Sequence, residues 1–383
     1  MNNFSHYCPT RLVFGEGTIA HLERLVPESK RVLLTYGQGS IKRNGVYQQV
    51  MEALTRCEVF TFGGIEPNPQ YATLLEAVAA CREHRVELLL AVGGGSVLDG
   101  TKFVAAAHYF EGDDPWAILE GARVSRALPI GTVLTLPATG SESNPNAVIS
   151  RDEIREKSHF GSELVIPEFA ILDPSTTFSL DARQTANGIV DAFVHVLEQY
   201  ATYDVNTPLQ DRQAEAILST LVEEGPKALA HPHDYDARAN VMWCATQALN
   251  GLLACGTVGD WATHMIGHEL TALWGLDHAR SLAVVLPGVW RHERARKRDK
   301  LMKMGARVWG IVDGDAETRV EATIERTVQF MHDLGVSTSP ADYGIPPEGF
   351  VEVASRLAAR GMRLGERGHL GRDEVVAILK LCA

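Results

Sequence analysis

The chain contains 383 residues, which is enough for two domains of ordinary size. Hydrophobic residues make up 45% of the chain and charged residues 22%, values typical of a globular protein. The formal net charge of −12 argues against general binding to nucleic acid or to an anionic membrane, because the field of the protein would repel polyanions.

The N-terminal segment and the apolar runs show no targeting or membrane-spanning pattern. The first residues, MNNFSHYCPTRLVF, lack a basic stretch followed by an apolar run, so we expect no signal peptide. No uninterrupted apolar run reaches the ~20 residues that a transmembrane helix needs. The six cysteines are scattered without a CxxC pair, which is typical of reduced cytosolic thiols. We therefore expect a cytoplasmic location.

In the first 175 residues, short apolar runs alternate with helical patterns. The apolar runs predict strands at residues 31–36, 58–62, 86–92, 132–136 and 169–172. The intervening patterns predict helices at residues 46–55 and 71–84, and a third that ends near residue 107. Strands and helices in alternation are typical of a parallel sheet covered by helices. We therefore predict an α/β domain at residues 1–175.

After Pro174 the pattern changes to long amphipathic helices. The predicted helices are residues 182–200, 209–229, 235–254, 262–274, 283–294 and 297–309. Strand-like runs nearly vanish from this part of the chain. This change predicts a second, all-helical domain at residues 176–383.

Two glycine-rich turns follow predicted strands of the first domain, at residues 37–40 (GQGS) and 93–96 (GGGS). Glycine permits close approach of the backbone to a phosphate, and the next helix offers N–H groups and a positive dipole. Neither turn matches the Rossmann fingerprint, because positions 42 and 98 lack its third glycine. Any strand-to-helix turn can carry glycines, but two in one sheet favour a nucleotide site. Ser96 suits a helix cap or a phosphate donor, and Asp99 suits the first helical turn or the nicotinamide side of the cofactor.

The first glycine-rich turn indicates the choice of cofactor. Dehydrogenases that prefer NAD usually place an acidic residue near the adenosine ribose 2′-hydroxyl, where it would repel a 2′-phosphate. No Asp or Glu lies between Thr35 and Arg43, whereas Ser40, Lys42 and Arg43 offer a small donor and positive charge. This composition predicts NADPH rather than NADH.

The second domain contains candidate metal ligands. Asp191 and His195 are four residues apart, as are His264 and His268, so each pair lies on one face of a predicted helix. His278 follows, near the expected start of the next helix. One Asp/His pair is usually only a surface hydrogen bond, but histidines on a largely apolar helix need polar partners. Together these oxygen and nitrogen donors suit Zn²⁺ or Fe²⁺. The chain lacks HExxH, which disfavours a zinc protease of that type.

Four segments carry these features in a distinctive combination. They are GGGSVLDGTK (93–102), LTLPATGSES (134–143), DAFVH (191–195) and DWATHMIGHELTALWGLDHARSLAVVLP (260–287). The combination resembles the iron-containing alcohol dehydrogenase family, in particular its NADPH-dependent aldehyde reductases and butanol-dehydrogenase-like enzymes. The resemblance covers nearly the whole chain. It implies the fold shared with dehydroquinate synthase, in which an α/β nucleotide-binding domain with a parallel sheet precedes an all-α metal-binding domain.

The resemblance also implies roles for individual residues. It implies four metal ligands, namely Asp191, His195, His264 and His278. It places His268 beside the metal without ligating it. It implies that the cofactor is contacted by Gly37, Gly39, Ser40, Gly94, Gly95, Ser96, Asp99, Thr135, Thr139, Ser141 and Lys157, of which the first three surround the 2′-phosphate. Two positions depart from the family pattern. Ala279 follows the final ligand where many members have glycine, and Trp274 occupies a position where a smaller or polar residue would be unsurprising.

The resulting hypothesis is an NADPH-dependent alcohol dehydrogenase or aldehyde reductase that interconverts aldehydes and primary alcohols. A divalent metal, iron or zinc, polarises the carbonyl, NADPH supplies a hydride, and His268 takes part in a proton relay. The aromatic residues Phe160, Trp261 and Trp274 suggest an apolar pocket for a small aldehyde or alcohol. We expect a homodimer.

Two other functions are compatible with parts of the pattern. A lyase of the dehydroquinate-synthase type would need Lys or Arg residues for a phosphorylated substrate, and the metal-adjacent segments offer only Arg280. A non-catalytic nucleotide-binding scaffold would be favoured by loss of a ligand or of a glycine turn, and all of these are present.

Overall fold

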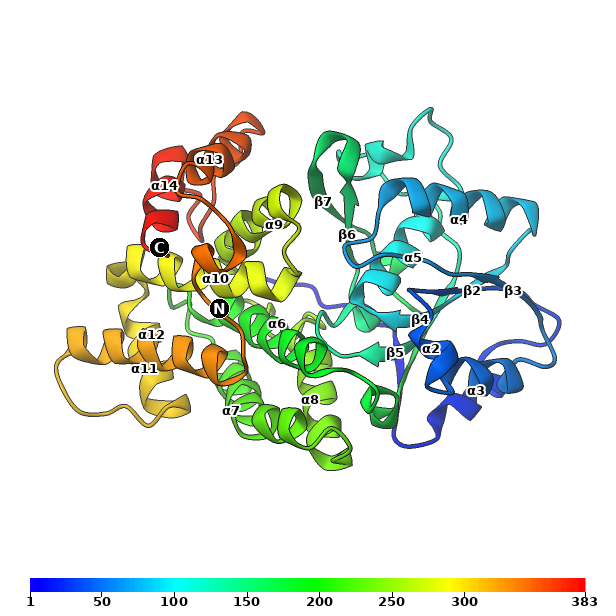
Figure 1. Ribbon diagram of the computed structural model, residues 1–383, viewed down its shortest axis with the longest axis horizontal. Coiled ribbons are helices and arrows are strands. Elements are labelled where there is room, and N and C mark those ends of the chain that lie inside the picture. The colour runs from blue at the N-terminus through cyan, green and yellow to red at the C-terminus, as the bar shows by residue number, and fades with distance from the viewer. Residues whose placement is uncertain (383) are drawn as a thin grey trace. The chain divides into compact units, whose positions relative to one another are not determined.

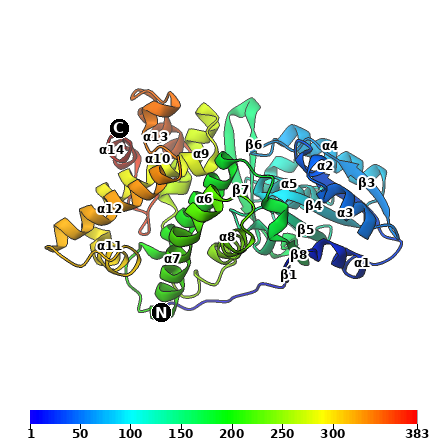
Figure 2. The same ribbon diagram turned by 60° about the horizontal axis from the view of Figure 1, so that its bottom comes forward.

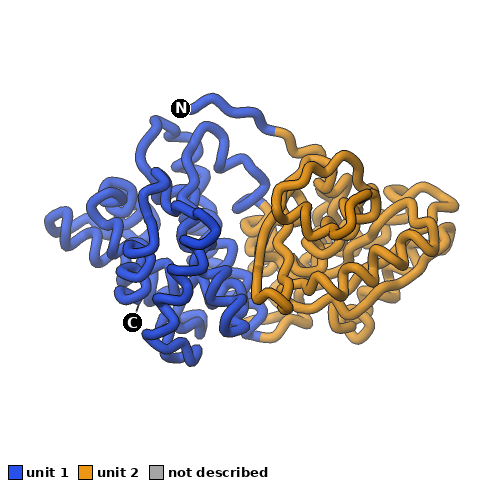
Figure 3. The backbone as a smooth tube through the Cα atoms, turned by 90° about the horizontal axis from the view of Figure 1, so that it is seen from above, with its two compact units in different colours: residues 1–6, 182–230, 247–383 blue, residues 7–181, 231–246 orange. Residues whose placement is uncertain are grey.

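The computed structural model describes residues 1–382, which form two compact units (Figure 3). Unit 1 contains residues 1–6, residues 182–230 and the chain from Gln247 onward, and unit 2 contains residues 7–181 and 231–246. This division differs from a single boundary at residue 175 for physical reasons. The side chain of Met242 is buried in a core of unit 2, and the backbone N–H of Asn2 donates to the carbonyl of Gly256 in unit 1. The functional division at residue 175 stays a prediction.

Unit 2 is built on a six-stranded, wholly parallel sheet with the strand order β1-β8-β5-β4-β2-β3. Its strands are β1 (Arg11–Phe14), β2 (Arg31–Tyr36), β3 (Glu58–Phe62), β4 (Leu88–Gly94), β5 (Ile130–Leu136) and β8 (Phe169–Leu172). The predicted α/β architecture is confirmed. The sequence does not predict β1, because this short edge strand is defined by its pairing with β8.

Helices cover both faces of this sheet (Figure 1). One face packs against α4 (Tyr71–Glu83) and α5 (Gly95–Ala107). The other face packs against α1 (Leu22–Leu25), α2 (Ser40–Arg43) and α3 (Val46–Ala53). Successive side chains of a strand point to opposite faces, so Leu33 joins the first core while Val32 and Leu34 join the second. Burial on both faces explains why these strands read as continuous apolar runs.

Unit 2 also contains an antiparallel hairpin and most of one helix from later in the chain. The hairpin pairs β6 (Asn146–Arg151) with β7 (Glu156–Gly161). The helix is α8 (Tyr235–Ala248), which ends six residues before the predicted helix does. The hydroxyl of Thr246 on α8 donates to the buried carboxylate of Glu142, which helps to hold the helix in this unit.

Unit 1 is helical (Figure 2). Its helices are α6 (Ala182–Tyr200), α7 (Pro208–Ala230), α9 (Ala262–Trp274), α10 (His278–His292), α11 (Arg294–Val308), α12 (Ala316–Asp333), α13 (Gly349–Ala359) and α14 (Arg372–Lys380). Helix α6 packs against α7 and α10, and every residue from Gly188 to Tyr200 is buried. Polar side chains on α6 are therefore enclosed by protein and need polar partners. Among residues 1–382, no helix combines the length and apolarity that would let it cross a membrane.

Candidate metal centre and nucleotide-binding turns

The four side chains that the family pattern implies as metal ligands converge inside unit 1. One ligand atom from each of Asp191, His195, His264 and His278 lies within 4.8 Å of the others. Oδ1 of Asp191 is 3.5 Å from Nδ1 of His195 and 3.6 Å from Nε2 of His278. Asp191 and His195 come from adjacent turns of α6, His264 from the first turn of α9, and His278 is the first residue of α10.

This arrangement fits a first-row divalent cation. Bonds of ~2.1 Å at tetrahedral angles place neighbouring ligand atoms ~3.4 Å apart, close to the two distances from Asp191. Burial lowers the pKa of His195 to about 4, so its imidazole is neutral at neutral pH, as ligation requires. Nδ1 of His195 is buried and makes no hydrogen bond within the described chain. One carboxylate and three imidazoles suit zinc or iron.

His268 lies beside this cluster without belonging to it. It follows His264 by one turn of α9, and its side chain is buried. Its ring centroid is 5.4 Å from that of His278 and 6.4 Å from that of His264. The spacing along the helix places both histidines on one face, but only His264 is directed into the four-residue group. The part of His268 in a proton relay stays a prediction.

The start of α10, which carries His278, is tied to α6 by a polar network. The carboxylate of Asp277 accepts hydrogen bonds of 2.8 Å from Arg183 and from Asn187. Arg280 donates to Asn187 at 3.2 Å, so it is engaged in holding the two helices together. This network determines where His278 stands relative to the two α6 ligands.

The sequence pattern does not single out Glu198, although its carboxylate contacts a proposed ligand directly. Oε2 of Glu198 accepts a 3.0 Å hydrogen bond from the backbone N–H of His264 and lies 3.1 Å from Nδ1 of the same residue. Its position seven residues after Asp191 and three after His195 places all three on one face of α6. That spacing was the available signal.

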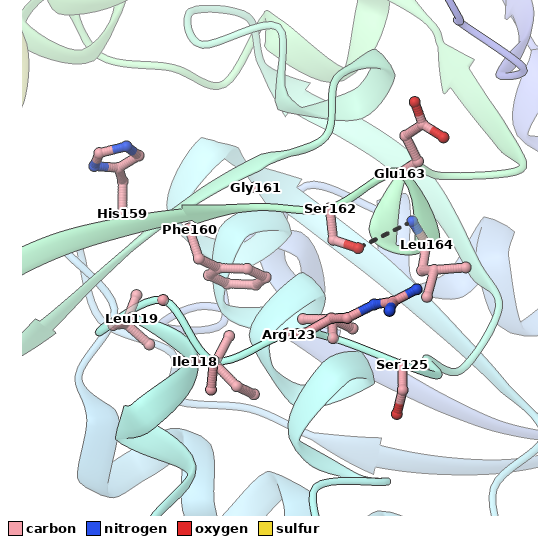
Figure 4. A pocket seen from close by; sticks show the side chains of 13 residues that line it. Ile118, Leu119, Arg123, Ser125, His159, Phe160, Gly161, Ser162, Glu163 and Leu164 are labelled. Carbon is pink, nitrogen blue, oxygen red and sulfur yellow. Dashed lines mark hydrogen bonds between the residues drawn. The ribbon is translucent and has the colours of Figure 1, made fainter.

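The three aromatic residues expected near the substrate lie in different environments. The ring of Trp261 is 5.2 Å from that of His264 and 6.5 Å from that of His195. Trp261 has φ of 61° at the start of α9, an uncommon backbone conformation for a bulky residue. Trp274 packs over Gly349 at the start of α13, where a Cβ would lie 2.6 Å from the indole. Phe160 lines a cavity of about 680 Å³ in unit 2, formed by residues 118, 119, 121–125 and 159–164 (Figure 4). Apart from Phe160, that cavity contains none of the site residues predicted from the sequence.

Both glycine-rich turns lie at the carboxyl ends of neighbouring strands in unit 2. The turn at residues 37–40 follows β2, and the turn at 93–96 spans the end of β4 and the start of α5. The strand order reverses between β2 and β4, because β3 lies beyond one and β5 beyond the other. Nucleotides bind at such switch points in parallel sheets. Gly95 is required by close packing, since a Cβ there would lie 2.6 Å from the Thr139 side chain.

The carboxylate of Asp99 accepts two hydrogen bonds within unit 2. It accepts a 2.6 Å hydrogen bond from the hydroxyl of Ser141 and a 3.0 Å bond from the backbone N–H of Val148. The backbone N–H of Ser141 donates in turn to the hydroxyl of Thr139 at 3.2 Å. These bonds fasten the segment after β5 to α5. Thr135, buried as the penultimate residue of β5, lies just before this segment.

Lys157 and Ser96 are both hydrogen-bonded to Asn68, another residue that the sequence pattern does not single out. Nζ of Lys157 donates to the Asn68 side chain at 2.9 Å, and the Asn68 backbone N–H donates to the Ser96 hydroxyl at 3.3 Å. Asn68 has φ of 55°, in the left-handed region that asparagine tolerates better than most residues. Its place at the start of the short stretch NPQ was the weak signal available.

The turn after β2, predicted to surround the 2′-phosphate, is a short loop that leads into a helix. Gly39 has φ of 86° and Ser40, exposed to solvent, is the first residue of the short helix α2. The following Lys42 lies over the ring of Tyr36, with its Nζ 4.8 Å from the ring centroid. The loop from Gly37 to Lys42 therefore combines permissive backbone, a hydroxyl and a cation.

Comparison with known proteins agrees with this organisation. The model of the iron-containing alcohol dehydrogenases matches residues 9–174, and the C-terminal model of the Fe-containing alcohol dehydrogenase family matches residues 185–382. The chain belongs to the iron-containing alcohol dehydrogenase family. The family predicted from the four sequence segments is thus confirmed, together with its fold.

Individual members of the family are similar along their whole length. The NADPH-dependent aldehyde reductase YqhD of Escherichia coli is 54% identical over 377 residues, which cover 97% of each chain. A probable NADH-dependent butanol dehydrogenase of Bacillus subtilis is 41% identical, with 99% of each chain covered. Among solved structures, the substrate- and cofactor-free E. coli aldehyde reductase superposes with a TM-score of 0.93 at 51% identity and covers 100% of both chains. The NADH-dependent butanol dehydrogenase A of Thermotoga maritima superposes with a TM-score of 0.95 at 36% identity, covering 100% of this chain and 99% of its own.

Proposed function

We propose that this chain reduces small aldehydes to primary alcohols, reversibly, with NADPH and one divalent cation, iron or zinc. The observation that carries the proposal is the buried convergence of Asp191, His195, His264 and His278 in a chain 54% identical to an NADPH-dependent aldehyde reductase. When bound, the cation would supply Lewis-acid chemistry at the carbonyl and NADPH a hydride.

The residues of the chain have distinct parts in this proposal. The four ligands of unit 1 hold the cation, and Glu198 and Asp277 hold two of the elements that carry them. Backbone N–H groups at the start of α5, next to Gly94, Gly95 and Ser96, suit the pyrophosphate of the cofactor, because a helix N-terminus favours an anion. His268 delivers a proton toward the alcohol oxygen, either directly or through water, since it is close to the ligands and not one of them.

The activity is tested by following NADPH absorbance with butanal before and after removal of the metal by a chelator. We expect aldehyde-dependent oxidation that stops on chelation and returns when Fe²⁺ or Zn²⁺ is added back, because the carbonyl is polarised only by the bound cation. Elemental analysis of protein purified without added metal identifies the ion. Unchanged activity in verified metal-free protein, or no oxidation with any small aldehyde, would contradict the proposal.

Replacement of Ser40 by a negatively charged residue is expected to change the preference between NADPH and NADH. In Ser40→Asp, the new carboxylate would face the 2′-phosphate at an exposed position. The solvent-screened repulsion would cost about 1.4 to 2.8 kcal/mol, so kcat/KM for NADPH should fall about 10- to 100-fold. The value for NADH should change little. Ser40 is exposed at the first position of α2, where an acidic side chain does not disturb the fold.

Ser40→Asn is the matched control, because it has the same shape as the aspartate without its charge. It should lower kcat/KM for NADPH much less than Ser40→Asp. Equal losses with both cofactors in Ser40→Asp would place this turn away from the 2′-phosphate. Wild-type protein that prefers NADH would contradict the choice of cofactor itself.

The homodimer and the cytoplasmic location stay predictions, and light scattering of the purified protein tests the first. The lyase alternative gains no support from unit 1. Arg280 is bonded to Asn187 and lies 3.6 Å from the carboxylate of Asp277, so this cation is already engaged within the protein.

A further inference from the structure

Glu198 makes two contacts with one proposed metal ligand. Its carboxylate is buried on α6, one turn beyond His195. One oxygen, Oε2, accepts from the backbone N–H of His264 at 3.0 Å and stands 3.1 Å from its Nδ1. The backbone contact holds the first turn of α9 against α6, and the ring contact restricts rotation of the imidazole. A side chain that only filled space would need neither bond.

The ring contact has a chemical consequence for His264. Oε2 of Glu198 already accepts a hydrogen bond from the backbone N–H of His264, so it is the acceptor in the ring contact as well, and the proton of the neutral imidazole must be on Nδ1. The lone pair is then on Nε2, which becomes the nitrogen that can bind a cation. Histidine ligands usually donate their other ring N–H to a carboxylate or carbonyl, which fixes the ring and makes it a stronger donor.

The backbone of Glu198 is held in turn by a network of buried polar groups. The backbone N–H of Asp260 donates to the Glu198 carbonyl at 2.9 Å. The Asp260 side chain accepts from the backbone N–H of Ala262 at 3.1 Å and from Nζ of Lys297 at 2.5 Å. Lys297 also donates to the Ala201 carbonyl at 2.6 Å, just beyond the end of α6. These bonds join the end of α6, the start of α9 and α11, so the position of Glu198 is determined by three elements.

We propose that Glu198 is a positioning residue of the metal centre, which fixes the tautomer and orientation of His264 so that Nε2 faces the other three ligands. This inference rests on the proposed function, and it predicts a specific defect when the carboxylate is lost. The protein should fold and should bind the same cation more weakly.

Glu198→Gln keeps the size and one acceptor oxygen but removes the charge. Zinc affinity, measured by competition with a chromogenic chelator, should fall about 10- to 100-fold, the loss typical of outer-shell partners of metal-bound histidine. The absorption spectrum of the Co²⁺-substituted protein should change in intensity or position, because the His264 donor is altered. At saturating metal, kcat should recover most of its wild-type value, since Glu198 does not touch the substrate.

Glu269→Gln is the matched control. Glu269, on α9, is also a buried carboxylate, but its partners are Arg356 of α13 and Arg360 just after that helix rather than a proposed ligand. This variant should lower the Tm and leave zinc affinity unchanged. Circular dichroism of both metal-free variants separates weakened binding from misfolding. Glu198→Asp, which keeps the carboxylate on a shorter side chain, should bind zinc more tightly than Glu198→Gln.

The outcomes distinguish the two proposals. Wild-type zinc affinity in a folded Glu198→Gln variant overturns the positioning role and leaves the proposed activity intact. Wild-type protein that binds zinc tightly but reduces no aldehyde overturns the proposed activity, while weaker zinc binding by Glu198→Gln still supports the positioning role. A wild-type protein without measurable affinity for zinc, Co²⁺ or Fe²⁺ overturns both.

Discussion

Replacement of His264 by alanine is expected to abolish metal retention and turnover together. His264 supplies one of four converging ligand atoms, and its imidazole is the one fastened to α6 through Glu198. The substitution removes a donor from the coordination shell and leaves a cavity that water would fill. The loss of affinity should exceed the ~10- to 100-fold typical of removing an outer-shell partner. Turnover should fall in parallel, because the carbonyl is no longer polarised.

Metal content by elemental analysis and aldehyde-dependent NADPH oxidation on the same preparation check this expectation. His332→Ala is the control, since His332 is an exposed histidine on α12 whose ring is bonded to Thr338 and is far from the four-residue group in sequence. That variant should retain both metal and activity. A His264→Ala protein that is free of metal and fully active would remove the basis for the metal centre.

Replacement of His268 by alanine is expected to lower turnover by about 100-fold or more while the metal stays bound, which is the range for loss of a general acid or base. His268 is buried next to His278 and lies outside the group of four, so its loss should not open the coordination shell. Replacement of the two histidines of α9 is thus expected to have different effects on metal binding, although they are four residues apart on one helix face.

Three measurements separate a proton relay from a structural role for His268. Metal content should equal that of the wild type, added imidazole should restore part of the turnover, and the solvent deuterium isotope effect should change. His268→Gln, which retains a polar side chain without a titratable nitrogen, should remain impaired. Wild-type turnover in His268→Ala would exclude this residue from the relay, and metal loss equal to that of His264→Ala would make it a fourth imidazole ligand.

Local periodicity accounts for the parts of the fold that the sequence predicts well. The bounds of β2, β3, β8, α6 and α9 agree with the predicted ranges. For β2, β8 and the two helices, burial on both faces of the strand or on most of the helix leaves a continuous signal in adjacent residues. The strand β1 and the hairpin of β6 and β7 leave little such signal. Their backbone groups are paired only after distant segments meet, as in the pairing of β1 with β8.

The metal centre shows the same division between local and tertiary information. The spacing of Asp191 with His195, and of His264 with His268, determines by itself that each pair shares a helix face. It leaves five candidate ligands, and only the family pattern reduces them to four. In the structure, α10 packs against α6 and α9, and this packing brings His278 within reach of Asp191. Tertiary packing therefore decides which of the five residues form the group of four.

The sequence by itself therefore determines the family, the two kinds of domain and the chemistry of the donor groups, because these depend on residue types and on spacings within single elements. Which hydrogen-bond partners contact those groups is decided by the tertiary structure alone. Glu198 beside His264, and Asn68 between Lys157 and Ser96, join residues 66, 89 and 28 positions apart. No helical or strand period relates such positions, so their contacts exist only once the elements have packed.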